Sequence, residues 1–154
     1  MPISDLLSSD RVAILTEAAD TDAVLDAAAR LLADASPSHT QVISESLRQR
    51  ERLGSTAIGY GVAIPHGRNS AYDHARAAFL RLDRPVPFSA GDGEPVDLVF
   101  AMSVPEHFTQ QHLQWLAELA ERFANAEFRT ALRGASDTEA LRDLLLRERL
   151  THAA

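Results

Sequence analysis

The chain has 154 residues, of which 45% are hydrophobic and 24% charged, and its formal net charge is −7. These values are typical of one packed domain, since domains average roughly 100–200 residues, and they exclude a disordered chain. Cysteine and lysine are both absent and all 15 basic residues are arginine, which excludes disulfides, thiolate metal sites, thiol catalysis, a P-loop lysine and a Schiff base.

The distribution of charge and hydropathy along the chain limits which classes of partner are expected. No basic run is present to neutralise phosphates, so nucleic acid is not an expected partner. No apolar run approaches the roughly 20 residues that span a bilayer, and the first residues lack the basic and apolar regions of a signal peptide. We therefore expect a cytoplasmic protein without membrane insertion.

The first third of the chain predicts two helices and one strand. We expect a helical turn at 3–8, a strand at Arg11–Leu15, a helix from the capping residues Asp20 and Thr21 to about Ala33, and a helix from 38 to about 53. Ser38 and Gln41 fit a capping box at the start of that second helix, and Gly54 follows its expected end.

Residues 54–69 differ in character, because four of the seven glycines lie there. Val62–Ile64 predicts a very short strand that Pro65 interrupts. His66 follows, and a glycine-rich loop that presents a histidine at the end of a strand is a candidate functional site. The residues alone also fit a histidine that is hydrogen-bonded in an ordinary turn.

The remaining elements alternate between apolar runs and helical patterns. We expect strands at Ala75–Leu82 and Asp97–Val104, a loop at 85–95, and helices at about 109–124, 127–132 and 136–149. Pro85 and Pro87 suggest that the first of these strands is an edge strand. Gly134 ends the short helix, and Ser136 with Glu139 forms a second capping box. This pattern predicts the α/β class, as a single domain spanning 1–154.

Two long segments carry a family resemblance. GVAIPHGR, preceded by RERLGSTAIG, resembles the phosphorylation-site signature of the phosphotransferase-system enzyme IIA family of the mannitol/fructose type. PVPFSAGDGEPVDLVFAMSVPE followed by TQQHLQWLAELAERF resembles its downstream half, although Ser103 stands in a usually aliphatic stretch. The GST at the site is most similar to the nitrogen-regulatory branch. The resemblance implies a small mixed sheet flanked by helices on both sides.

The resemblance also assigns three site residues. It implies that His66 accepts a phosphoryl group from an HPr-like phosphohistidine carrier (NPr in the nitrogen branch), that His112 assists, and that Arg50 stabilises the group. The residues alone also fit a solvated Arg50 in a charged run and a His112 at the boundary of a helix core. Which ring nitrogen of His66 reacts is open from the sequence, and the resemblance suggests Nε2.

Four neighbouring residues complete the expected pocket. The backbone N–H groups of Gly67 and Arg68 are candidates for an anion nest, and the Arg68 side chain is a second candidate cation. Ser55 and Thr56 are expected to line the pocket. No cofactor and no metal is expected.

The resemblance implies a phosphotransferase component that acts mainly as a regulator. In the nitrogen branch, its phosphorylation state would control regulatory targets such as potassium transporters or sensor kinases. Two alternatives stay open: a sugar-specific enzyme IIA that passes phosphate to a IIB domain of a fructose or mannitol permease, and a binding module without phosphotransfer.

Overall fold

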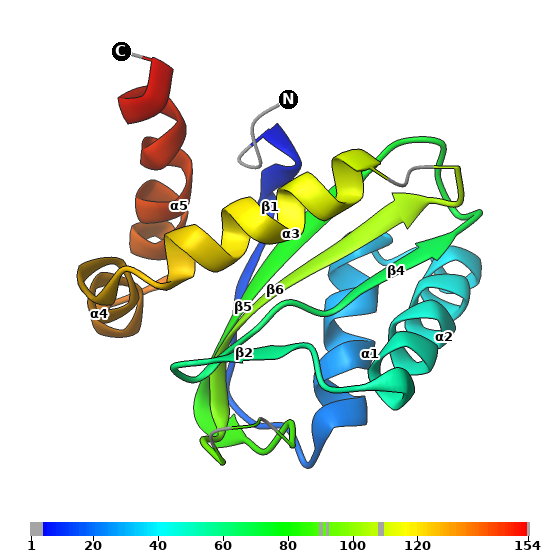
Figure 1. Cartoon of the computed structure of the whole chain (residues 1–154), viewed down its shortest axis with the longest axis horizontal. Coiled ribbons are helices and arrows are strands. Elements are labelled where there is room, and N and C mark those ends of the chain that lie inside the picture. The colour runs from blue at the N-terminus through cyan, green and yellow to red at the C-terminus, as the bar shows by residue number, and fades with distance from the viewer. Residues whose placement is uncertain (1–4, 90, 92, 108–109, 154) are drawn as a thin grey trace.

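The computed structural model of the chain describes residues 5–89, 91, 93–107 and 110–153 (Figure 1). In chain order its elements are β1 Leu7–Leu15, α1 Thr21–Leu32, α2 Pro37–Leu53, β2 Ala57–Gly59, β3 Val62–Ala63, β4 His66–Asn69, β5 Arg76–Val86, β6 Val96–Pro105, α3 Gln110–Phe123, α4 Ala126–Gly134 and α5 Thr138–Ala153. No helix in this part of the chain is long and apolar enough to cross a membrane.

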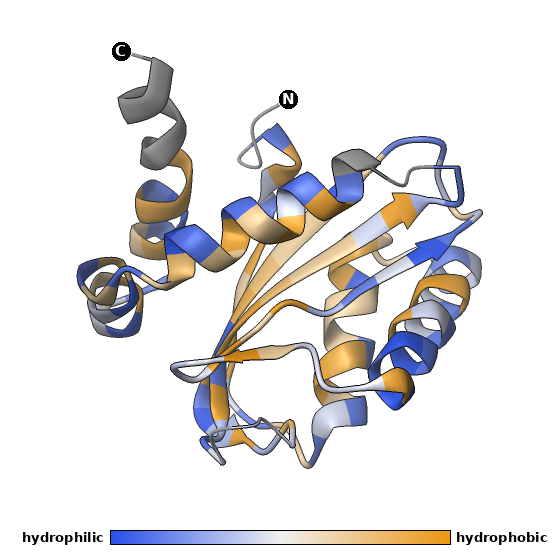
Figure 2. Cartoon of the chain, in the orientation of Figure 1, coloured by the Kyte–Doolittle hydropathy of each residue, from blue (hydrophilic) through white to orange (hydrophobic). Residues whose placement is uncertain are grey.

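The strands form one mixed sheet with β6 at its centre. Its order is β1-β5-β6-β3-β2. β4 pairs with the same side of β6 as β3, further along β6 towards its C-terminal end. β5 is antiparallel to β6, whereas β1 is parallel to β5, and β3 and β4 are both parallel to β6. β6 is buried at nearly every position, as expected for a central strand covered on both faces. Figure 2 shows the hydrophobic residues concentrated along β5 and β6.

Alternate residues of the central strands β5 and β6 belong to two hydrophobic cores, one on each face of the sheet. Successive side chains of a strand point to opposite faces. Phe79 and Phe100 pack with α3, α4 and α5 on one face, and the ring of Phe79 stacks on Phe123 at 6.3 Å. Leu80 and Val99 pack with α1 and α2 on the other face. The predicted α/β sheet with helices on both sides is therefore confirmed.

The helices agree with the sequence in extent but differ in their capping. The Asp20 carboxylate accepts the Ala23 N–H at 2.9 Å, which confirms the predicted start of α1. The two capping boxes are wrong. α2 begins one residue before Ser38, at a proline whose fixed φ suits the first helical position. Asp137, rather than Ser136, caps α5 by accepting the Ala140 N–H at 2.9 Å.

Three strand predictions also need correction. Residues 7 and 8 belong to β1 rather than to a helical turn, because Leu7 pairs with Ala77; residues 3 and 4 lie outside the described residues. β5 is an internal strand, not an edge strand, and it continues to Val86. Its proline is tolerated because β1 pairs with β5 only as far as Leu82, so β6 is the one described strand beside Pro85.

Candidate functional site

A cavity of about 880 Å³ lies where α2, β4 and α3 meet. It brings together Arg50, His66 and His112, which the sequence separates by 16 and 46 positions. Its lining residues are Ser46, Gln49, Arg50, Leu53, His66, Gly67, Arg68, His112, Leu113 and Leu116.

His66 is the first residue of β4 and pairs with Met102 of β6, so a strand holds it rather than the predicted loop. Its Nδ1 lies 2.8 Å from the Ile64 carbonyl oxygen. A carbonyl only accepts, so Nδ1 carries the proton, and Nε2 is the basic nitrogen of the neutral ring. Burial lowers the pKa of His66, the Ile64 carbonyl opposes this shift and the charge of Arg50 adds to it. The ring is therefore neutral at pH 7.

Gly67 permits a close approach between β4 and α2. A Cβ at this position would lie 1.9 Å from the Ser46 hydroxyl oxygen and 3.0 Å from the Ser46 carbonyl carbon. Only glycine therefore fits at this separation. One helical turn after Ser46, α2 carries Arg50, so the close approach also places that arginine beside His66.

His112 lies in the first turn of α3 and is buried. Its ring meets the ring of His66 edge-on, with centroids 5.0 Å apart. Burial lowers the pKa of His112 to about 4, and the charges of His66, Arg68 and Arg50 contribute. Its Nε2 is buried and has no hydrogen-bond partner among the described residues. A buried polar atom without a partner is costly, so this nitrogen marks a site that a ligand can complete.

Two arginines give the cavity a positive character within an acidic chain. Arg50 donates from Nη1 to the Gly54 carbonyl oxygen at 2.9 Å, which uses only one of its five N–H groups. The Arg68 side chain is exposed and has no hydrogen-bond or ion-pair partner in the described part of the chain. Together these cations can bind a phosphate-like anion beside the two histidines.

Ser55 and Thr56 are not among the lining residues, contrary to expectation. Ser55 donates to the Phe88 carbonyl oxygen at 2.5 Å. Thr56 is buried, and its hydroxyl and its N–H donate to the two carboxylate oxygens of Glu51 at 2.6 and 2.8 Å. Both residues hold the turn that follows α2, so their polar groups are already used.

Sequence reasoning missed two sets of residues. Ser46, Gln49 and Leu53 lie with Arg50 on one face of α2, and the helical spacing around Arg50 was the available signal. Leu53 and Leu113 are 85% and 66% exposed, so large apolar side chains border the cavity. No group of three or more metal-binding side chains occurs among the described residues.

A buried polar network behind the cavity was also missed. The Asn69 amide donates to the hydroxyl oxygens of Ser103 at 3.0 Å and of Ser46 at 3.4 Å. Its carbonyl oxygen accepts the Ala71 N–H at 3.0 Å. The network ties β4 to β6 and α2, and it explains why a serine stands at position 103 in an otherwise apolar strand.

Comparisons with known proteins place this geometry in context. Residues 5–148 match the family described as phosphoenolpyruvate-dependent sugar phosphotransferase system, EIIA 2. The chain is 37% identical over 145 residues to a nitrogen regulatory protein of Bradyrhizobium diazoefficiens, covering 94% of this chain and 95% of that protein. It is 39% identical over 145 residues to a nitrogen regulatory protein of Pseudomonas aeruginosa, covering 94% of each.

A solved structure also resembles the chain in both fold and sequence. The crystal structure of nitrogen regulatory protein IIA-Ntr from Neisseria meningitidis matches with a TM-score of 0.83 and 39% identity, covering 93% of this chain and 98% of that chain.

Proposed function

Because this chain belongs to the EIIA 2 family of the phosphoenolpyruvate-dependent sugar phosphotransferase system, we propose that Nε2 of His66 carries a phosphoryl group received from an HPr-like phosphohistidine carrier. The hydrogen bond from Nδ1 to the Ile64 carbonyl carries this proposal, since it leaves Nε2 as the nucleophilic nitrogen. The lowered pKa of His66 keeps that nitrogen unprotonated at pH 7.

The transfer step balances without a cofactor. The Nε2 lone pair attacks the phosphorus of the carrier's phosphohistidine, a new N–P bond forms, and the carrier's N–P bond breaks with its electron pair returning to the carrier's ring. His66 keeps its Nδ1 proton, so its ring gains positive character as the bond forms. The Ile64 carbonyl stabilises that charge through the existing hydrogen bond.

The incoming group brings roughly −1.5 to −2 charges, which the cavity must balance. Arg50 keeps four N–H groups beyond the one bonded to Gly54, and Arg68 is unpaired within the described residues. Each hydrogen bond to a charged group contributes roughly 1.5–3 kcal/mol, enough to hold the phosphoryl group without making it inert. His112 takes up a proton beside the new anion and donates to a phosphoryl oxygen.

The nitrogen-regulatory relatives support a regulatory output. The chain covers 94–95% of the length of two of them. We therefore propose that the carrier is the nitrogen-type NPr, and that the phosphorylation state of His66 controls binding to target proteins in the cytoplasm, such as potassium transporters or sensor kinases. The protein then acts as a phosphotransferase component used mainly as a regulator.

Phosphorylation in a reconstituted relay tests the proposal. The chain is incubated with phosphoenolpyruvate, enzyme I and either an NPr-type or a sugar-type carrier, and its intact mass is measured. We expect one acid-labile phosphoryl group on the wild type and none on His66→Ala. His74→Ala, at an exposed histidine, is the matched control and stays competent.

Two results would overturn parts of this proposal. A failure of the wild type to gain mass with either carrier would remove phosphotransfer and leave a binding module. Rapid loss of the phosphoryl group to a fructose- or mannitol-specific IIB domain would instead assign a sugar-specific output.

A further inference from the structure

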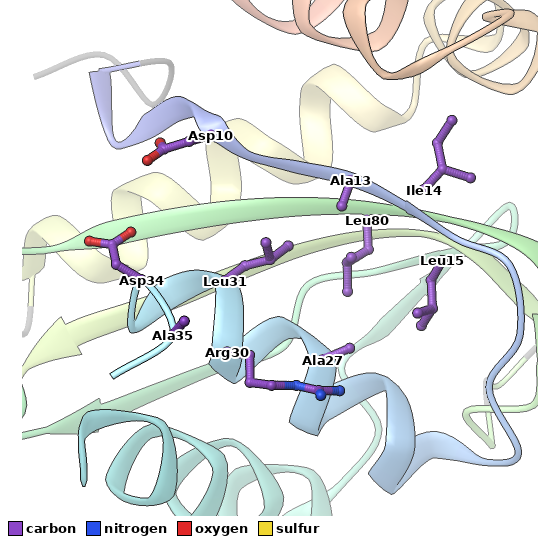
Figure 3. Close-up of a pocket in the computed structure, with 10 residues that line it drawn as sticks. All are labelled: Asp10, Ala13, Ile14, Leu15, Ala27, Arg30, Leu31, Asp34, Ala35 and Leu80. Carbon is purple, nitrogen blue, oxygen red and sulfur yellow. The ribbon is translucent and has the colours of Figure 1, made fainter. Parts of the chain in front are cut away.

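A second cavity lies between β1 and α1, on a part of the molecule that shares no lining residue with the His66 cavity (Figure 3). Its volume is about 470 Å³ and most of its lining is apolar. β1 contributes Ala13, Ile14 and Leu15, α1 contributes Ala27 and Leu31, and Leu80 of β5 forms part of the wall. We call this cavity the edge groove.

The edge groove runs along the free side of an edge strand. β1 is the last strand of the described sheet and pairs only with β5. Successive side chains of a strand point to opposite faces, yet the consecutive residues Ala13, Ile14 and Leu15 all line the groove. The groove therefore extends to the outer side of this strand, where backbone N–H and C=O groups point away from β5.

Charged residues, prolines and bulges normally prevent another chain from pairing with an edge strand. In β1 the charged residues Asp10 and Arg11 and a shift in register lie before Val12, so only the last part of the strand lacks this protection. Residues 12–15 read Val-Ala-Ile-Leu without a charge, and three of the four are half-buried. The helix beside them adds apolar surface, with Leu31 also half-buried. An edge strand beside a helix suits an extended peptide, which adds as a strand and places alternate side chains in the groove.

The two carboxylates at the groove lie beside arginines outside it. Asp34 forms ion pairs with Arg76 and, at 3.9 Å, with Arg11. Asp10 accepts a hydrogen bond from the Ser8 hydroxyl, which lowers its pKa, and the charges of Arg11 and Arg76 lower that pKa further. Neither carboxylate is therefore left to select a basic ligand.

Arg30 is the cation of the groove. Its side chain is exposed and has no hydrogen-bond or ion-pair partner in the described part of the chain. Its charge helps to lower the pKa of Asp26, but the Asp26 carboxylate is bonded directly to Arg48 and Ser44. A free guanidinium beside an apolar groove selects a ligand that carries a carboxylate.

We propose that the edge groove binds an extended segment of a partner protein, which adds as a strand to β1, places apolar side chains at alternate positions between β1 and α1, and pairs an acidic group with Arg30. Backbone hydrogen bonds supply affinity that is independent of sequence, and the apolar wall and Arg30 supply selection. Binding at the edge groove requires no phosphoryl transfer at His66, so the two proposals are tested independently of each other.

Titration of the full chain with synthetic peptides, followed by backbone amide NMR, tests this proposal. The probe is the hexapeptide acetyl-TVTIEV with a free carboxyl terminus, which alternates β-branched apolar and polar residues and carries acidic groups. We expect shift changes concentrated at 10–15 and 27–35. A version methylated on alternate backbone nitrogens should bind at least about tenfold more weakly, because it cannot pair as a strand.

Charge reversal tests the role of Arg30. Arg30→Glu should weaken binding of the acidic probe by about tenfold, the size of one lost charge-assisted hydrogen bond, and should favour the amidated peptide acetyl-TVTIKV. Arg84→Glu makes the same charge change at an exposed position outside the groove and should have no effect. Amide spectra of the free variants confirm that both fold.

Three outcomes overturn the proposal. One is the absence of shift changes at millimolar peptide, and another is equal binding of the methylated and unmethylated probes. The third is a concentration-dependent dimer in sedimentation that Ala13→Pro abolishes, because this would assign the edge to a second copy of the chain.

Discussion

At the start of β6, Arg133 donates from Nε and Nη2 to the Asp97 carboxylate at 2.9 Å and also bonds the Tyr60 carbonyl oxygen. At the far end of the same strand, around His66, Arg68 is unpaired within the described residues and the buried Nε2 of His112 has no partner. In the first cluster the charges are paired, and Arg133 bonds α4 both to β6 and to the turn between β2 and β3. The second leaves its polar groups open, which is typical of a site that awaits a ligand.

The largest expected difference between these regions is in phosphoryl transfer. His66→Gln should abolish phosphorylation while leaving the fold intact, because it keeps a polar side chain of similar size. Arg133→Met should remain fully competent for transfer. Intact-mass measurement after the relay reaction compares the two variants. Loss of phosphorylation in Arg133→Met would show that the cluster at the start of β6 also takes part in phosphoryl transfer.

The close approach at Gly67 should be the next most sensitive feature. Gly67→Ala forces its Cβ into Ser46 and should destabilise the fold by about 1–3 kcal/mol, as overpacking does. It should also slow phosphorylation, because α2 carries Arg50. Denaturant unfolding and the rate of phosphorylation are the measurements. Gly134→Ala, where a Cβ would meet nothing within 4 Å, is the control, and an equal loss there would contradict the explanation.

The Arg133–Asp97 ion pair at the start of β6 should contribute to stability and not to phosphoryl transfer. Arg133→Met removes hydrogen bonds to a carboxylate, and since the pair is partly exposed we expect a loss of about 1–2 kcal/mol. Thermal unfolding should show a fall of roughly 2–8 °C for a chain of this size. An unchanged midpoint would show that the ion pair contributes nothing measurable.

The smallest expected effect is a dependence of stability on pH. The pKa of His112 is about 4 in the folded chain and roughly 6.5 in the unfolded chain, so the unfolded chain binds more protons between these values. Stability contributed by neutral His112 is complete above pH 6.5 and is lost as the pH falls towards 4. Partial solvent screening makes about 1 kcal/mol a realistic size.

Comparing urea unfolding at pH 7 and pH 5 measures this effect. His112→Asn should reduce the dependence, and the lowered pKa of His66 should sustain the rest, whereas His74→Ala at an exposed position should keep it whole. An identical slope in the wild type and His112→Asn would assign the dependence to other groups.

Local sequence patterns predicted most elements because they arise from neighbouring residues. The helical spacing that predicts α1 and α3 and the apolar run that predicts β6 appear in the structure with small shifts of their ends. The two predicted capping boxes were wrong because a neighbouring residue suits the start of each helix better. α2 begins at Pro37, and the Asp137 carboxylate caps α5. β4 was missed because His-Gly-Arg-Asn has no strand pattern and pairs only with residues 36 positions further along.

The site shows the same division. The sequence by itself determined the family, through the Pro65-His66-Gly67 segment and its flanks, and with it His66, His112 and Arg50 as candidate residues. Only the tertiary structure decided that these three share one cavity, that Nδ1 of His66 is the protonated nitrogen, and that Ser55 and Thr56 lie elsewhere. Residue types and short-range spacing are written in the chain, whereas distances between remote residues depend on how sheet pairing and helix packing bury surface together.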